Sequence, residues 1–209
     1  MTQVALAARK KKAYHHGNLK RALLDAALER IAAEGAPSFT LRELATRVGV
    51  THPAAYRHFE DKRALLVAIA LEGLAELEES LVRVAEEQRG AARSIRVTEI
   101  VRAYVAFART RPAHYRVMFG PRLNRDGRFP ELEATLERAY LLLYRALGGT
   151  GESMRAADRP GHDRVFAVWS FAHGYASLLA DGRLPISSRE SSDKHVARLV
   201  DLWLSGSIA

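Results

Sequence analysis

The fold is decided by the stretch TLRELATRVGVTHPAAYRHF at residues 40–59. Thr40 and Glu43 have the spacing of a capping box, in which each side chain accepts a hydrogen bond from the other residue's backbone amide. Gly49 has the position of a helix-terminating glycine. Thr51 is placed to cap the next helix, which we expect to reach about residue 58. The stretch therefore predicts two short helices joined by a tight glycine turn.

On both sides of this stretch the sequence has helical periodicity, without the alternation or hairpin signals of strands. Asn18 is the expected N-cap of a first helix that Gly35 ends. A long fourth helix is expected at 62–88, shared between two modules. Further helices are expected at about 93–110, 112–119, 131–147, 162–181 and 190–205. We predict an all-α protein of about nine helices, with a three-helix N-terminal domain and a larger C-terminal helical domain.

The basic charge of the chain is concentrated near its N-terminal end. The 209 residues carry a formal net charge of +8 and no cysteine, which excludes disulfides and thiolate metal sites. Residues 1–62 hold 11 Lys and Arg against 6 Asp and Glu, and four consecutive basic residues lie at 9–12. Such a charge distribution favours a polyanionic partner, nucleic acid first and an anionic membrane surface second.

Two short helices with a glycine turn suit a helix-turn-helix, which places its second helix in the major groove of DNA. Arg42 and Arg57 have the chemistry to address guanine edges. Tyr56, His58 and Lys62, together with Thr40, are better placed for phosphates. The alternative is a pair of structural helices with a solvated polar face. The basic arm at the N-terminus favours the DNA interpretation.

Five motifs occur in a fixed order within residues 14–66. They are YHHGNL at 14–19, TLRELA at 40–45, GV at 49–50, AYRHF at 55–59 and KRALL at 62–66. Together they resemble the N-terminal DNA-binding domain of the tetracycline-repressor (TetR) family of bacterial transcription regulators. The resemblance implies phosphate contacts from Tyr56, His58 and Lys62, base contacts from Arg42, His52 and Arg57, and backbone contacts from Thr40 and Thr51. Pro53 completes the expected DNA-binding set. Because Ala54 and Ala55 fall where family members differ, no operator sequence is implied.

Two stretches of the C-terminal half resemble a subgroup of the same family. They are RPAHYRVMFG at 111–120 and WSFAHG at 169–174, which continues to LLADG at 178–182. Together they resemble the C-terminal domain that a Trp, His, Gly signature marks in some TetR-type regulators. The resemblance implies a homodimer, which would place two recognition helices about 34–36 Å apart, or somewhat more, on successive major grooves.

Apolar stripes at helical spacing run along the last two expected helices. In a symmetric dimer they would form a four-helix interface. The alternative is that both stripes face the core of their own protomer. The stripe residues are Val165, Val168, Ala172 and Ala176 on one helix, and Val196, Leu199, Val200 and Trp203 on the next.

Aromatic and soft side chains of the C-terminal half predict an apolar pocket for a small hydrophobic effector. For each of them, ordinary core packing is the competing explanation. The candidate ligand-binding residues are Tyr104, Phe107, Tyr115, Met118, Phe119, Phe166, Trp169 and His173, and Phe129, Tyr140 and Tyr144 belong to the same aromatic set.

The expected segments are a basic arm at 1–17, a helix-turn-helix domain at 18–62 and an effector-binding and dimerisation domain at 63–209. The first eight residues are too short and weakly apolar for a signal peptide. No run of about 18 apolar residues is present. We therefore expect no membrane partner and a cytoplasmic location, at the nucleoid when DNA is bound.

The expected function is that of a dimeric repressor, which binds a palindromic operator and is released by a small effector of unknown identity. The effector would tilt the long fourth helix and change the separation of the two reading heads. No nucleotide loop, nucleophile signature or set of metal ligands at regular spacing is found, so we expect no cofactor, no metal site and no enzyme activity. Two alternatives stay open: a nucleoid-type DNA-binding protein without an effector, and a helical enzyme.

Overall fold

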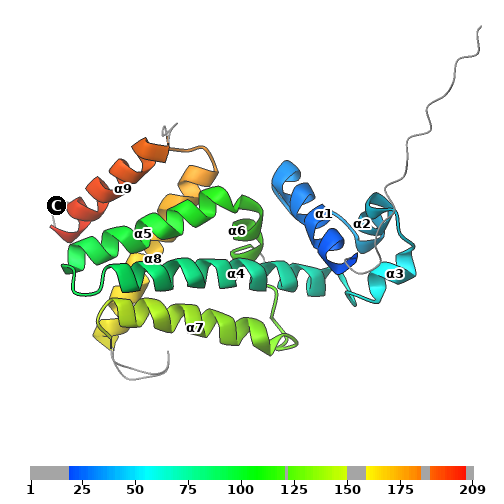
Figure 1. Cartoon of the computed structure of the whole chain (residues 1–209), viewed down its shortest axis with the longest axis horizontal. Helices are drawn as coiled ribbons and strands as arrows, with labels where there is room; N and C mark the ends of the chain where they lie inside the picture. Colours follow the sequence, from blue (N-terminus) through cyan, green and yellow to red (C-terminus); the bar gives the residue numbers. More distant parts are fainter. Residues whose placement is uncertain (1–18, 121, 150–158, 185–188, 206–209) are drawn as a thin grey trace, which may run out of the picture.

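The computed structural model describes residues 19–120, 122–149, 159–184 and 189–205, in which all regular structure is helical (Figure 1). The predicted all-α architecture of nine helices is confirmed for these residues. The expected N-terminal arm and the Asn18 cap lie outside them. The helices are α1 (Leu19–Glu34), α2 (Leu41–Val48), α3 (His52–Tyr56), α4 (Lys62–Glu87), α5 (Arg93–Thr110), α6 (Pro112–Met118), α7 (Pro130–Ala146), α8 (Arg159–Ala180) and α9 (Arg189–Leu204).

The capping box that begins α2 is confirmed. The hydroxyl of Thr40 accepts from the Glu43 amide at 3.2 Å, and the Glu43 carboxylate accepts from the Thr40 amide at 2.7 Å. Gly49 ends α2 in the left-handed region, with φ of 79°, where residues with a side chain are strained. The local sequence signals therefore determine where α2 begins and ends.

Helix α3 is shorter than expected, because it ends at Tyr56 and not near residue 58. Thr51 occupies the N-cap position but its side chain makes no capping hydrogen bond. After α3 the chain turns so that Phe59, which is 4% exposed, enters the core beneath α1 and α4. Hydrogen bonds of helical spacing nevertheless continue past Tyr56, because the Arg57 amide donates to Pro53 at 3.2 Å and the Phe59 amide to Ala55 at 3.1 Å, so the expected end near residue 58 differs only at the boundary.

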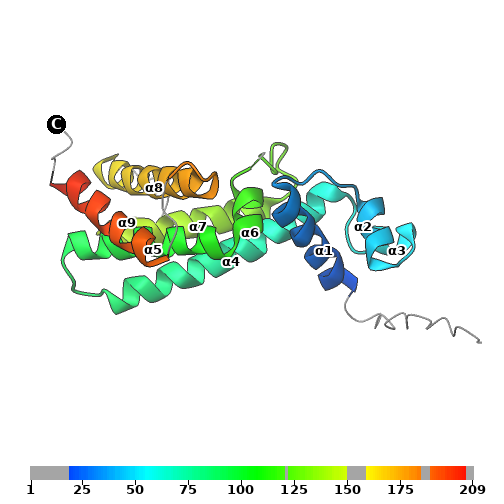
Figure 2. The ribbon, with the colours of Figure 1, turned by 90° about the horizontal axis from the view of Figure 1, so that it is seen from above.

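Helix α4 is a single long element that belongs to two hydrophobic cores. Asp61 caps it by accepting from the Ala64 amide at 2.7 Å. Its N-terminal half, including Leu65 and Leu74, packs with α1–α3 and α6, and its later residues Leu77 and Leu81 pack in the second core. Figures 1 and 2 show α4 running from the small N-terminal unit along the length of the helical body. Any tilt of α4 therefore moves side chains in both hydrophobic cores.

The body of the molecule is built around α5. Helices α4, α8 and α9 pack against α5, while α7 lies along α4 and also contacts α8. Figure 2 shows α8 and α9 together on the side of the body opposite α4. Within the described residues no helix is both long and apolar enough to span a bilayer.

The predicted dimer stripes of α8 and α9 face inward, which corrects the sequence expectation. Six of the eight side chains are at most 3% exposed and belong to the second core of their own protomer, while Leu199 and Trp203 are half-buried. Helical spacing marks the buried side of a helix without saying which partner buries it, and here α5 does so. The buried six are Val165, Val168, Ala172, Ala176, Val196 and Val200.

Candidate DNA-binding surface and effector pocket

Helices α2 and α3 form the outer end of the N-terminal unit. Eight of the nine residues predicted to contact DNA have exposed side chains there. The buried contacts that hold the two helices together come from Leu44, Ala45 and Ala55, each fully buried. The structure therefore keeps the predicted set on one accessible end of the molecule: Thr40, Arg42, Thr51, His52, Pro53, Tyr56, Arg57 and His58.

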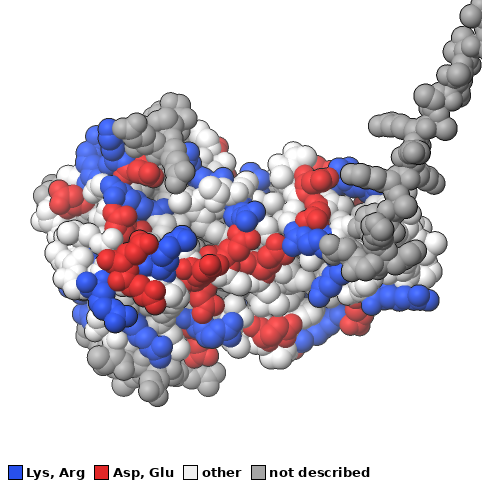
Figure 3. Space-filling model, viewed as in Figure 1, with Lys and Arg blue, Asp and Glu red and all other residues white. Residues whose placement is uncertain are grey.

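The arginines of this end differ in whether an acidic side chain already binds them. Arg47 is paired with Glu29 of α1 at 2.8 Å. Arg42 and Arg57 form no ion pair with any described residue, so both guanidinium groups are free for an external anion or base edge. Figure 3 shows basic side chains bordering the α2–α3 end, whereas acidic ones gather along the middle of the same face.

Lys62 has a structural role that the sequence did not predict. Its ammonium group donates to the carbonyl oxygen of Pro37 and lies 5.1 Å from the centre of the Phe39 ring. Both partners belong to the connection between α1 and α2. The predicted phosphate contact from Lys62 would therefore compete with a contact that fixes this connection.

Arginine–carboxylate pairs join the N-terminal unit to the body. Arg128, in the loop before α7, binds Asp61 at 2.5 Å and Glu60 at 2.6 Å. Arg63 on α4 pairs with Asp126 of the same loop at 2.7 Å. Burial works against ionisation of Asp61, but the hydrogen bonds from Arg128 and the backbone outweigh it and hold the Asp61 pKa below its usual range. The start of α4 is thus tied to the loop that leads into α7.

A cavity of about 660 Å³ lies within the body, bounded by α4, α5, α7 and α8. Of the predicted pocket residues, Tyr104, Phe119, Tyr140 and Trp169 line it. Its remaining walls are mostly aliphatic, and the pattern of aromatic and soft side chains in the sequence does not indicate them. These missed residues are Leu74, Leu77, Leu81, Ile100, Glu133, Leu136, Glu137, Ala139, Leu143, Val168 and Ala172.

The other predicted pocket residues do not line this cavity. Phe107 is buried in the core beside it, and Met118 packs where the two cores meet. Phe166 is 46% exposed on the outer side of α8, because the helix turns it away from α5. Phe129 and Tyr144 are core residues.

A partly buried polar cluster adjoins the cavity at Tyr104. The hydroxyl groups of Tyr104 and Tyr115 lie 2.9 and 3.1 Å from Nδ1 of His173, and the Tyr115 hydroxyl is also 2.9 Å from the Ser177 hydroxyl. Burial lowers the pKa of His173 and raises the pKa of Tyr104. All these groups are therefore neutral near pH 7, and the cluster can rearrange its hydrogen bonds without creating charge.

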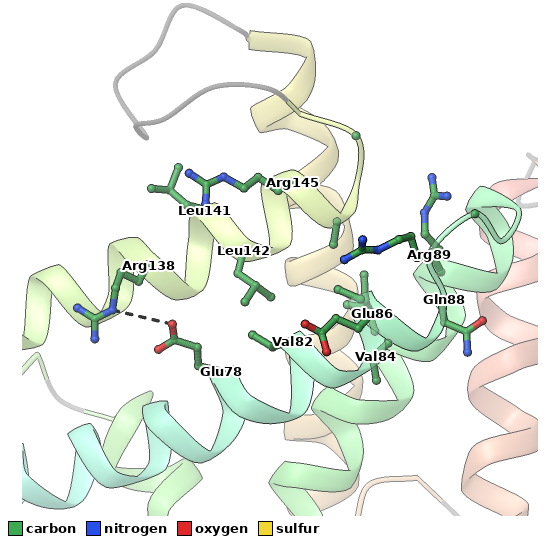
Figure 4. A pocket seen from close by; sticks show the side chains of 16 residues that line it. Glu78, Val82, Val84, Glu86, Gln88, Arg89, Arg138, Leu141, Leu142 and Arg145 are labelled. Atoms are coloured by element: carbon green, nitrogen blue, oxygen red, sulfur yellow. Dashed lines mark ion pairs between the residues drawn. The ribbon is translucent and has the colours of Figure 1, made fainter.

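A second hollow, a groove of about 870 Å³, lies between the C-terminal parts of α4 and α7. Figure 4 shows side chains of these two helices facing each other across it, with Arg138 opposite Glu78 at 3.9 Å. The groove mixes arginines and glutamates with a few aliphatic side chains, whereas the cavity lining is mostly apolar. The cavity is therefore the better match to an apolar small molecule.

An exposed helix-turn-helix joined by one long helix to a hollow helical body defines a DNA-binding regulator. Residues 23–69 match the family described as bacterial regulatory proteins, tetR family, and residues 97–202 match the tetracyclin repressor-like C-terminal domain. The chain belongs to the TetR family of transcriptional regulators, a family of DNA-binding proteins and not of enzymes. Its Trp, His, Gly subgroup stays a prediction.

Curated relatives match over part of the chain. The class D tetracycline repressor of Escherichia coli is 43% identical over 56 residues, which are 27% of this chain and 26% of the repressor. The nucleoid occlusion factor SlmA of Vibrio cholerae is 34% identical over 109 residues, 49% of this chain and 52% of that protein. The chain thus spans about a quarter of the length of the tetracycline repressor it matches.

Solved structures match over nearly the whole chain. A protein of unknown function from Rhodococcus sp. RHA1 has 28% identity and a TM-score of 0.72, covering 94% of this chain and 98% of its own. The regulator LfrR from Mycobacterium smegmatis, solved in complex with proflavine, has 20% identity and a TM-score of 0.55, covering 87% and 93%. The second likeness concerns the fold alone.

Proposed function

We propose that this TetR-family regulator is a homodimeric repressor that binds a near-palindromic operator and is released by a small hydrophobic effector. The observation that carries the proposal is the exposed α2–α3 end, which presents Arg42 and Arg57 without an ion pair to any described residue. An unpaired guanidinium group donates two parallel hydrogen bonds to guanine, and each such contact discriminates by about 1–3 kcal/mol.

The division of roles on this end follows from chemistry and position. Arg42, His52 and Arg57 are the proposed base readers, since they carry donors that reach base edges. Tyr56 and His58, together with Thr40 and Thr51, contact the DNA backbone and fix the register of α3 in the groove. Lys62 acts mainly by holding the α1–α2 connection.

The proposed dimer interface is the exposed face of α8 and α9, which replaces the buried stripes. Phe166 and Leu178 on α8 are 46% and 44% exposed, and Leu202 on α9 is 41% exposed. A side chain added at Gly174 would meet nothing within 4 Å in the protomer. A symmetry mate can therefore approach α8 closely at this glycine and bury the neighbouring apolar side chains.

The cavity is the proposed effector site. Leu74, Leu77 and Leu81 bring α4 into its lining, so a ligand that prefers one position of α4 also selects one position of the DNA-reading end. The regulator LfrR, which is similar to this chain in fold, was solved in complex with proflavine, and this supports a small-molecule ligand. For this chain we expect an apolar or aromatic compound, with Glu133 and Glu137 favouring a positively charged group.

Selection of bound DNA from a random pool tests the proposal. The full-length chain should enrich one near-palindromic site and bind that fragment saturably at a salt concentration where a shuffled fragment is released. A screen of candidate metabolites on that fragment then identifies the effector. Equal binding to selected and shuffled fragments would support a nucleoid-type protein and contradict the repressor.

A further inference from the structure

Three metal-ligating side chains meet at the junction of α4 and α6. Glu72 and Glu76 lie one turn apart on α4, His114 comes from α6, and one ligand atom from each lies within 4.8 Å of the others. His114 is only 4% exposed. Gly73 makes this approach possible, because a Cβ there would lie 3.0 Å from the His114 Cβ and 2.5 Å from the Met118 sulfur.

The imidazole of His114 has an unsatisfied nitrogen that points into this cluster. Its Nε2 is buried, makes no hydrogen bond to any described residue, and lies 3.4 Å from Oε1 of Glu72. Buried polar atoms in native structures almost always have a partner, and each exception calls for an explanation such as an ion. A cation shared between the ring nitrogen and the carboxylate oxygen supplies that partner.

The separation of the two atoms fits a shared metal ion. Zinc binds imidazole nitrogen at about 2.0–2.1 Å and carboxylate oxygen at about 2.0–2.2 Å in tetrahedral geometry, so two of its ligand atoms lie about 3.4 Å apart. The observed distance from His114 Nε2 to Glu72 Oε1 is 3.4 Å. The third ligand atom, from Glu76, lies within 4.8 Å of the other two, and rotation of this flexible side chain can bring it closer.

Two arginines already bind the carboxylates of the cluster. Arg21 of α1 donates to both oxygens of Glu72, at 2.9 and 2.7 Å, and Arg111 binds Glu76 at 2.6 Å. A carboxylate has about four acceptor positions, so it can bind a metal and keep one arginine contact. Because the two arginines balance the two glutamates, a divalent ion would add unbalanced charge and weaken the Arg21–Glu72 pair.

We propose that Glu72, Glu76 and His114 bind a divalent transition-metal ion of the zinc type, in competition with the ion pair that holds α1 against α4. The sequence predicted no metal site because His114 is far along the chain from the two glutamates. Only the packing of α6 on α4 brings the three together. The site is separate from the apolar cavity. Metal binding there would be a second ligand-binding event, located where α1 of the N-terminal unit packs against α4.

Titration of the full-length chain with Co²⁺, followed by its visible absorption, tests the site without DNA. The parent for all variants carries His15→Ala and His16→Ala, which removes the adjacent histidines of the arm as a background site. We expect the parent to bind one equivalent with the intense absorption of tetrahedral cobalt. His114→Gln should weaken the affinity by more than about tenfold, and the exposed Glu79→Gln on the same helix should leave it unchanged.

Two further variants keep the proposal falsifiable if His114→Gln does not fold. Glu76→Gln changes a half-buried side chain and should also weaken Co²⁺ binding, while Arg21→Ala should strengthen it by removing the competitor for Glu72. No binding by the parent, or an affinity equal to that of the parent in both His114→Gln and Glu76→Gln, would overturn the site. Unchanged affinity in Arg21→Ala would overturn the competition. None of these outcomes bears on operator binding.

Discussion

Replacing Asp61 by alanine should weaken the joint at which α4 begins. Asp61 accepts from the Ala64 amide at 2.7 Å and from Arg128 at 2.5 Å. Loss of an aspartate N-cap costs about 1 kcal/mol, and an exposed ion pair contributes about 0.2–1 kcal/mol. The Asp61 side chain is 42% exposed, so we take about 0.5 kcal/mol for the pair. The expected loss in free energy of unfolding is about 1.5 kcal/mol.

Urea denaturation followed by circular dichroism measures this loss, and two matched variants separate its causes. Asp61→Asn keeps an effective cap and removes only the ion pair, so it should cost about 0.5 kcal/mol. Asp126→Ala removes the neighbouring pair with Arg63 without touching a cap, and should cost a similar amount. Equal losses in Asp61→Ala and Asp61→Asn would refute the reasoning, because the cap would then contribute nothing.

The Asp61–Arg128 ion pair also predicts that the contribution of Asp61 to the free energy of unfolding depends on pH. Because the folded state holds the Asp61 pKa below its usual range, the folded protein binds fewer protons at this carboxyl than the unfolded chain. The contribution is therefore fully present above the unfolded-state pKa of about 3.9 and is lost as pH falls through the folded-state pKa. The stability difference between wild type and Asp61→Ala should shrink on acidification below about pH 3.9.

Three further predictions concern the body. Gly174→Leu fills the open space on α8, so sedimentation should show a weakened dimer with an intact helical spectrum, and a dimer of wild-type affinity would contradict the proposed interface. Burial lowers the pKa of His173, so the free energy of unfolding should fall as pH drops through about 6.5; an equal slope in His173→Gln would show that another group is responsible. Leu77→Trp fills the cavity and should abolish binding of an apolar fluorescent dye while DNA binding persists; retained dye binding would place the dye elsewhere.

Local signals in the sequence predicted the N-terminal unit well. The capping box at Thr40 and the left-handed Gly49 each depend only on residues a few positions away in the sequence, and both are present. The end of α3 differs from the expected one by two residues, and helical hydrogen bonds continue to Phe59. Local hydrogen bonding therefore specifies these helix boundaries to within a residue or two.

Features that depend on packing between distant segments were not predictable. The spacing of the apolar stripes of α8 and α9 left a dimer interface and the protomer's own core as alternatives, and α5 of the same protomer buries most of them. Aromatic content identified part of the cavity and missed its aliphatic walls. The partner of Lys62 is the carbonyl of Pro37, 25 residues earlier, and no spacing rule joins the two. Helical periodicity in the sequence indicates which face of a helix is buried. Only the packed structure shows which other element covers that face.

The central claim is that the exposed face of α2 and α3 reads base sequence. The most direct test compares the wild type and Arg57→Ala on the selected operator and on its full set of single-base variants, by fluorescence anisotropy at fixed salt. We expect the wild type to discriminate at one base step by about 1–3 kcal/mol, and Arg57→Ala to lose discrimination at that step alone. A uniform loss of affinity over all sequences in Arg57→Ala would contradict it.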